Sequence, residues 1–178
     1  MLNGHGLDFT GADLSGLELV GAEFGEAILI QVSLVGASLY TAWLREAQLS
    51  EADLSGAFLR KVQGQYCQAR HAKLCGADLQ RADFSDSDLL GADLSGARLQ
   101  RVTFSDSDLR QTSLRDCAFD MTRLSRARLA DSDVRGAHGL VRGPIDVGVG
   151  APRLIDGQEL QAWFVSNGAS DVEVYQRP

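Results

Sequence analysis

The stretch L-CGADL-QRADF-SDSDL-LGADL-SGARL, from Leu74 to Leu99, decides the fold, because a large apolar residue recurs in it every five positions. Leu or Phe stands at 74, 79, 84, 89, 94 and 99, and Ala or Ser stands two residues before each of them. The register continues without an insertion from Phe9 to Val134, and only Gly64 and Ala69 break the run of Leu, Phe or Val at the centre of each unit. A fixed internal period is typical of repeat architectures. The sequence therefore predicts one continuous solenoid.

A period of five fits neither the 3.6 of a helix nor the 2 of an ordinary strand. It does fit a short extended segment followed by a corner. Counting from the unit's centre, i, we expect i and i−2 to point inward and i−1 and i+1 to point outward. Position i+2 is expected to form the corner, because glycine, which accepts turn conformations most easily, recurs there: Gly11, Gly16, Gly21, Gly36, Gly56, Gly76, Gly91, Gly96 and Gly136.

The A-D-L-x-x and A-x-L-x-x units closely resemble those of the pentapeptide-repeat proteins, over roughly residues 7 to 138. The resemblance implies an all-β solenoid, a right-handed quadrilateral β-helix with four pentapeptides per coil. The predicted organisation is a β-helix over residues 1–138, followed by a C-terminal segment over residues 139–178 with a helix and a short strand.

Around residues 64–71 the centres shrink to glycine and alanine without losing phase. Two large interior groups are missing there, so either the neighbouring side chains fill the axis or the rod bends. We expect a bend. A Gly-containing break between two blocks of coils is also similar to the Qnr-type and Mfp-type members of the family, which interact with DNA gyrase.

After Ala137 the period ends, and the stretches Gly139–Pro144 and Val147–Pro152 are predicted to be loops. Asp156 is a candidate helix N-cap, with Glu159 three residues on, and Gly168 fits the position after the helix. An alternating strand should follow. The segment either caps the last coil or joins two chains, as the similar tail of the Qnr- and Mfp-type proteins does. The second reading predicts a homodimer through Leu160, Trp163, Phe164, Val172 and Val174.

Composition and motifs exclude several function classes. The formal net charge of −7 argues against direct binding to nucleic acid or to an anionic membrane. No signal peptide or membrane-length apolar run is visible, so a cytoplasmic location is expected. No catalytic motif is present, and the protein is predicted not to be an enzyme and to need no cofactor. Cys67, His71 and Cys75 are spaced by four, but Cys67 should point inward and the other two outward, so no metal site is expected.

Two outward-facing sets of residues are candidate partner-binding surfaces. The first is acidic, and four of its members should circle one coil, although an Asp at i−1 also has a structural use in capping backbone donors at the corner: Asp8, Asp13, Glu18, Glu23, Glu26, Asp53, Asp78, Asp83, Asp88 and Asp93. The alternative set is apolar: Ile28, Ile30, Tyr40, Trp43 and Phe58.

The resemblance implies a binding protein that mimics DNA and engages type II topoisomerase (DNA gyrase), protecting it from or regulating it against inhibitors such as quinolones. Residues 1–60 hold 8 acids and 2 bases, a net of −6, over about 13 Å of rod at ~4.8 Å per coil. Duplex DNA of that length carries roughly 8 charges. Residues 1–138 have a net of only −5, so the mimicry should be confined to the N-terminal coils. The alternative function is an interaction scaffold with no topoisomerase role.

Overall fold

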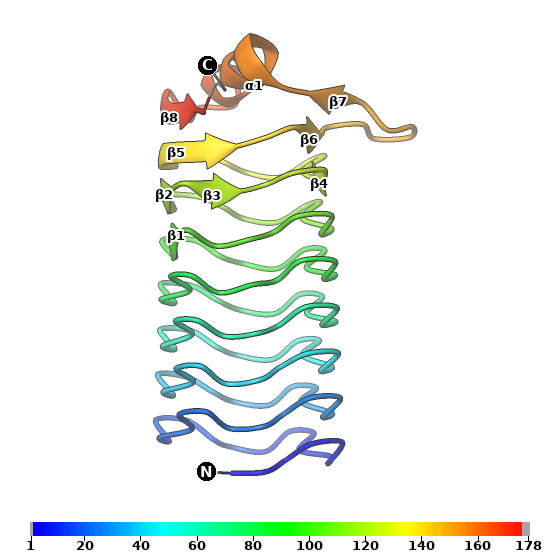
Figure 1. Ribbon diagram of the computed structural model, residues 1–178, viewed down its shortest axis with the longest axis vertical. Helices are drawn as coiled ribbons and strands as arrows, with labels where there is room; N and C mark the ends of the chain where they lie inside the picture. Colours follow the sequence, from blue (N-terminus) through cyan, green and yellow to red (C-terminus); the bar gives the residue numbers. More distant parts are fainter. Residues whose placement is uncertain (1, 176–178) are drawn as a thin grey trace.

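The computed structural model describes residues 2–175 and shows a straight rod of stacked coils, closed at its C-terminal end by a helix (Figure 1). From residue 3 to residue 118, each residue at i−1 in the repeat pairs in parallel with the residue 20 positions later. Asp8, for example, bridges to Ile28, which bridges to Gln48, and the series continues through Gln68 to Asp88. One coil therefore contains four pentapeptides, one on each side of the rod.

The interior of the rod is built from the residues at i and i−2. Leu94 at a centre and Ala92 and Ala97 at i−2 are all at most 1% exposed. Burying a leucine side chain contributes roughly 1.5–3 kcal/mol, and the repeat supplies such a group on nearly every side of every coil. The inward assignment made from the sequence is confirmed.

The corners are formed by position i+2, which adopts a left-handed backbone in every unit from residue 6 to residue 136, with φ between 54° and 71°. The N–H of Leu7 donates to the carbonyl of Gly4 across the first such corner, at 3.0 Å. A bond across four residues with a positive φ at the third is the geometry of a type II turn. Seventeen of these corner residues are not glycine, so the fold accepts left-handed strain at many corners.

At Gly64 the axis is filled by a neighbour. A Cβ on Gly64 would lie 2.7 Å from the ring of Phe84, which stands one coil further on, and Phe84 stacks in turn on Phe104 with 6.2 Å between ring centroids. The backbone ladder continues through this region, with the N–H of Gly64 donating to Asp83 at 2.8 Å. Neighbouring side chains therefore fill the axis at this point, and the expected bend of the rod is not seen (Figure 1).

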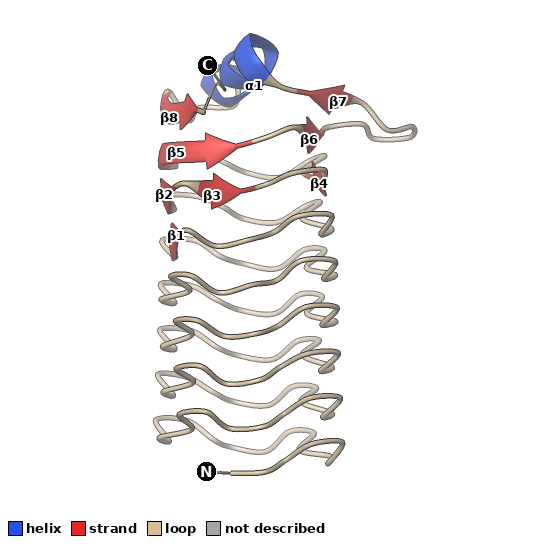
Figure 2. Ribbon diagram, in the orientation of Figure 1, coloured by secondary structure: helices blue, strands red, loops and turns tan. Residues whose placement is uncertain are grey.

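Extended strands and the helix gather at the C-terminal end, whereas the earlier coils pair through single-residue bridges (Figure 2). The elements are β1 (Arg98–Gln100), β2 (Ala118–Asp120), β3 (Thr122–Arg123), β4 (Ala127–Arg128), β5 (His138–Arg142), β6 (Ile145–Asp146), β7 (Leu154–Ile155), α1 (Gly157–Ser166) and β8 (Asp171–Val174). One sheet has the order β1-β2-β5-β3 with β8 added on β5, and the other has the order β4-β6-β7.

The prediction of a loop over Gly139–Pro144 is wrong, because β5 and β6 continue the solenoid for most of another coil. The register in which these two strands pair with the preceding coil explains why the five-residue sequence pattern stops. Ala118 pairs with His138, 20 residues on, but Thr122 pairs with Val141, 19 on, and Ala127 with Ile145, 18 on. Each shortened corner shifts the phase, so the five-residue period disappears while the coil persists. The predicted loop over Val147–Pro152 is confirmed.

Helix α1 begins and ends as predicted. Asp156 accepts a hydrogen bond from the N–H of Gly157, and Gly168 has a φ of +83°. Glu159, the expected partner in a capping box, instead accepts from Arg153 at 2.6 Å. In the part of the chain that the structure describes, no helix has the length and apolar character needed to cross a membrane.

Candidate protein-binding surface on the N-terminal coils

The aspartates at i−1 have a structural role at the corners. Each accepts a hydrogen bond from the backbone N–H two residues later, and the Asp8 carboxylate accepts from both the N–H and the hydroxyl of Thr10, at 2.8 and 2.6 Å. The same backbone contact is made by Asp8, Asp13, Asp53, Asp78, Asp83, Asp88, Asp93, Asp108 and Asp133. This geometry is the Asx turn, so the structural use predicted from the sequence is confirmed.

The predicted ring of Asp78, Asp83, Asp88 and Asp93 does circle one coil, but its carboxylates are engaged. Asp78 is only 8% exposed and lies 3.3 Å from an Arg98 guanidinium nitrogen. Its three neighbours accept from residues of the preceding coil: Asp83 from Gln65 at 2.9 Å, Asp88 from Arg70 at 2.6 Å and Asp93 from the Cys75 thiol at 3.0 Å. Two of the four carboxylates, Asp78 and Asp88, are therefore paired with arginines, while Asp83 and Asp93 accept only from neutral groups, so this ring carries less free charge than the sequence predicted.

The carboxylates of the first coils are different, because basic partners are missing beside them. From residue 2 to residue 44 the chain has no Lys or Arg. Among the described residues, the one ion pair made there joins His5 to Glu26, at 4.0 Å and with both side chains well exposed. Asp13 and Asp8 only cap corners, and no ion pair or side-chain hydrogen bond engages Glu18 or Glu23 within residues 2–175. Asp53, one coil further along, is paired with Lys73 at 3.6 Å.

The charge of the molecule is concentrated accordingly. Residues 1–60 carry 8 acids and 2 bases, whereas residues 61–178 carry 16 acids and 15 bases. The net charge of −6 lies on the first third of the chain and only −1 on the rest. Hydrogen bonds from Thr10, first that of its hydroxyl, also lower the pKa of Asp8 below its ordinary value.

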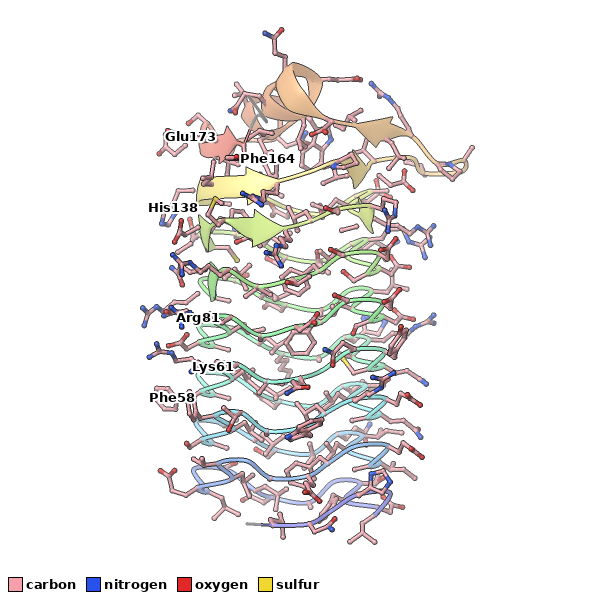
Figure 3. All side chains as sticks on the ribbon, viewed as in Figure 1. Phe58, Lys61, Arg81, His138, Phe164 and Glu173 are labelled. Carbon is pink, nitrogen blue, oxygen red and sulfur yellow. The ribbon has the colours of Figure 1, made fainter. Side chains whose placement is uncertain are left out.

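The apolar candidates do not form one patch. Ile28 and Ile30 are half-buried on one side of the rod, whereas Phe58 is 54% exposed on the side opposite to them. Figure 3 shows Phe58 projecting from the edge of the rod. Tyr40 shares the side of Phe58, and the Lys61 ammonium donates to its hydroxyl at 2.9 Å. The five residues are therefore not one surface, and Trp43 is the member that stands beside the unpaired acids.

Trp43 forms one wall of a hollow of about 330 Å³ on a corner of the first coils. Its side chain is 50% exposed, and it bridges to Glu23 in the coil before it. The sequence did not predict this hollow. The signal was present, since Gly25 is the one glycine at i+1 among the units centred on residues 4 to 134.

The predicted dimerisation residues lie mostly inside the single chain. Leu160, Phe164 and Val172 are fully buried and Val174 is 8% exposed, while Trp163 is half-buried with its ring 5.1 Å from that of Phe164. Figure 3 shows Phe164 between the helix and the last coil. These side chains cover the end of the solenoid, which is the cap alternative. Residues 176–178 of the predicted tail lie outside the described residues.

The cysteines do not converge. Cys67 is buried in the axis, and this burial raises the pKa of its thiol to about 12, far from the thiolate that a metal ion requires. The Cys75 thiol faces Asp93 on the outside. Within residues 2–175, no group of three or more His, Cys, Asp or Glu side chains is arranged to hold a metal ion.

The coil geometry and the repeat together define the class of protein. The sequence matches the family of pentapeptide repeats (8 copies) over residues 8–42, 42–81 and 77–116, and the chain belongs to this family. Pentapeptide-repeat proteins fold as right-handed quadrilateral β-helices, and the four-sided coils of 20 residues agree with this fold. Among curated protein sequences, none matches this chain significantly.

Solved structures share the fold. HetL, a protein involved in heterocyst differentiation regulation in the cyanobacterium Nostoc sp. strain PCC 7120, is 21% identical, with 85% of this chain and 89% of that chain covered and a TM-score of 0.54. A pentapeptide repeat protein of the Arabidopsis thaliana thylakoid lumen is 25% identical, with 72% and 84% covered and a TM-score of 0.56. Trypsin-treated QnrB1, a plasmid-mediated fluoroquinolone resistance protein, is 14% identical, with 98% and 92% covered and a TM-score of 0.54.

Proposed function

We propose that this pentapeptide-repeat scaffold binds a protein partner through its acidic N-terminal coils, and that the partner is a type II topoisomerase whose DNA-binding surface these coils occupy. One observation carries the proposal. The first coils hold five carboxylates and no Lys or Arg from residue 2 to residue 44. Further along the rod, bases nearly balance the acids, and several of the acids form ion pairs with arginines or lysines. The DNA-binding surface of a protein is basic, so it is complementary in charge to these acidic coils.

The charge density of the first coils supports DNA mimicry over a short length. The net −6 of residues 1–60 is spread over about 13 Å, along which duplex DNA carries roughly 8 phosphate charges. The remaining coils approach neutrality and do not contribute. The first coils would therefore mimic little more than one third of a helical turn of duplex DNA, at one end of the rod.

The likeness to QnrB1 supports the choice of topoisomerase, since fluoroquinolones act on that class of enzyme and QnrB1 is described as a resistance protein. Protection from or regulation against such inhibitors belongs to the proposal, as does the cytoplasmic location in which the two proteins would meet. The alternative is an interaction scaffold with no topoisomerase role. HetL supports it, since it has the same fold and is described as taking part in differentiation.

A supercoiling assay with purified gyrase, with and without a quinolone, tests the proposal. The charge reversal should be made at Glu18→Lys and Glu23→Lys together, because neither side chain caps a corner in the structure. The matched control is Asp171→Lys with Glu173→Lys, two exposed residues of β8 at the opposite end of the rod. We expect the wild-type protein and the control to change supercoiling, or its inhibition by the quinolone, and the N-terminal variant to lose that effect.

Two results would contradict the proposal. The first is no effect of the wild-type protein at concentrations of tens of micromolar, which favours the scaffold. The second is an equal effect of the N-terminal variant and the wild type, which would move the contact away from the acidic coils. Far-UV circular dichroism of each variant shows whether the fold is kept.

A further inference from the structure

The hollow beside Trp43 lies where one member of a stack of residues has no side chain. His5, Gly25 and Arg45 occupy the same i+1 position in three successive coils. A Cβ on Gly25 would already lie 3.0 Å from Nδ1 of His5 and 3.7 Å from the carbonyl oxygen of Arg45. The absence of a side chain on Gly25 lets the His5 ring lie against this coil, and His5, Gly25 and Arg45 together line the hollow.

The walls of the hollow combine an aromatic face with carboxylates. Trp43 and Glu23 stand on one side of Gly25, in bridged positions of neighbouring coils. Glu26 and Glu46 stand on the other side, both at corner positions. An aromatic ring beside carboxylates is an environment that attracts a cation, since the ring face is electron-rich and the carboxylates supply net charge.

The positive groups at the rim do not neutralise the hollow. The Arg45 Nε lies 3.2 Å from Glu46, and its guanidinium is stacked 5.2 Å from the ring centroid of Tyr66 in the next coil. His5 lies 4.0 Å from Glu26. Glu23 has no ion pair with any residue from 2 to 175, and it is bridged to Trp43 in the next coil.

We propose that the hollow is an anchor site for one guanidinium or ammonium side chain of a protein partner, held between the Trp43 ring and the Glu23 carboxylate. The proposal rests on the proposed function and deepens it, because it names the chemistry by which the acidic coils engage a basic surface. Exposed tryptophans in such hollows are frequent centres of binding energy in protein interfaces. A guanidinium fits best, because its plane stacks on the ring while its edge donates to the carboxylate.

Trp43 itself reports on the site. The chain has two tryptophans, so a Trp163→Phe background, excited at a wavelength that tyrosine does not absorb, leaves Trp43 as the single tryptophan that emits. The probe is N-acetyl-arginine amide, and the control ligand is N-acetyl-citrulline amide, which has nearly the same shape and no charge. At constant ionic strength we expect a saturable change in Trp43 fluorescence with the arginine probe and none with citrulline.

Two variants and a matched control locate the effect. Glu23→Gln should weaken binding of the arginine probe by about two- to fivefold. Gly25→Val should abolish it, because it adds a branched side chain to the lining of the hollow and removes no charged group. Phe58→Ala removes an equally exposed aromatic residue from another side of the rod and should leave binding unchanged.

The anchor proposal falls if the arginine probe gives no saturable change, if citrulline gives the same change, or if Gly25→Val binds as well as the parent. This outcome differs from failure of the proposed function. If the arginine probe binds at the hollow but the protein leaves supercoiling unaffected, the anchor site stands and topoisomerase is the wrong partner.

Discussion

At the scale of single residues, the fold depends on a corner that most amino acids adopt only under strain. The sequence revealed the corner through its glycines at i+2, and the structure shows the same left-handed conformation at seventeen other residues. The residue type does not mark those seventeen positions, because Glu, Lys, Arg, Asp and Gln all occur there, and only the five-residue register identifies them. The repeat imposes the corner through the interior leucines and the backbone ladder, and the side chain at i+2 has little influence.

The corners therefore respond to glycine substitution in both directions. Gly96 has a φ of +67° and open space around it, so Gly96→Ala meets no neighbour and should lower the stability by about 1 kcal/mol through backbone strain alone. Gln111, with a φ of +57° and an exposed side chain, should gain stability as Gln111→Gly. In thermal melts the two changes should move the midpoint in opposite directions, by roughly 2–4 °C.

Gly150→Ala is the control, because Gly150 is equally open and lacks a positive φ. It should leave the midpoint nearly unchanged. A loss at Gly150 as large as that at Gly96, or a loss in Gln111→Gly, would show that corner strain does not limit stability.

At the scale of elements, the sequence predicted helix α1 well and the coil beneath it poorly. The N-cap at Asp156 and the terminating Gly168 can be recognised from adjacent residues alone, because helix capping does not depend on distant parts of the chain. The strands β5 and β6 were missed because their pairing depends on residues 18 to 20 positions earlier and their register slips at two corners. The apolar face of α1 was visible in the sequence, but its composition could not show whether it covers its own chain or a second one.

The cap also closes the exposed edge of the last strand. The Gln161 amide nitrogen donates to the carbonyl of Val172 at 2.6 Å, and its oxygen accepts from the N–H of Val174 at 3.0 Å. This side chain takes the place that a further strand would occupy beside β8. An open strand edge can pair with another chain, so Gln161 ends the ladder at this face.

Gln161→Ala should therefore leave two backbone groups of β8 without partners, at a cost of about 1–3 kcal/mol, and should increase self-association. Gln158→Ala is the matched control, since Gln158 is exposed and lies within the same helix. Chemical denaturation measures the first effect and light scattering the second. Equal stability of the two variants would show that Gln161 does not cap the edge.

At the scale of the whole molecule, the acidic residues could be located from the sequence but their availability could not. Asp88 and Glu23 occupy the same i−1 position in different units, yet Asp88 pairs with Arg70, 18 residues before it, and Glu23 has no such partner among the described residues. The period of 20 brings such residues together, and the side chains on the neighbouring coils decide which carboxylates are neutralised. The result is a rod with one acidic end and a long, nearly neutral remainder.

The central claim is that this acidic end competes with DNA for a basic protein surface. The direct measurement is displacement of a fluorescently labelled DNA duplex from purified gyrase, followed by anisotropy at salt concentrations from about 50 to 300 mM. We predict that the wild-type protein displaces the duplex, that displacement weakens as salt rises, and that Glu18→Lys with Glu23→Lys weakens it by about tenfold. An undisplaced duplex at tens of micromolar protein, or displacement insensitive to both salt and charge reversal, would contradict the claim.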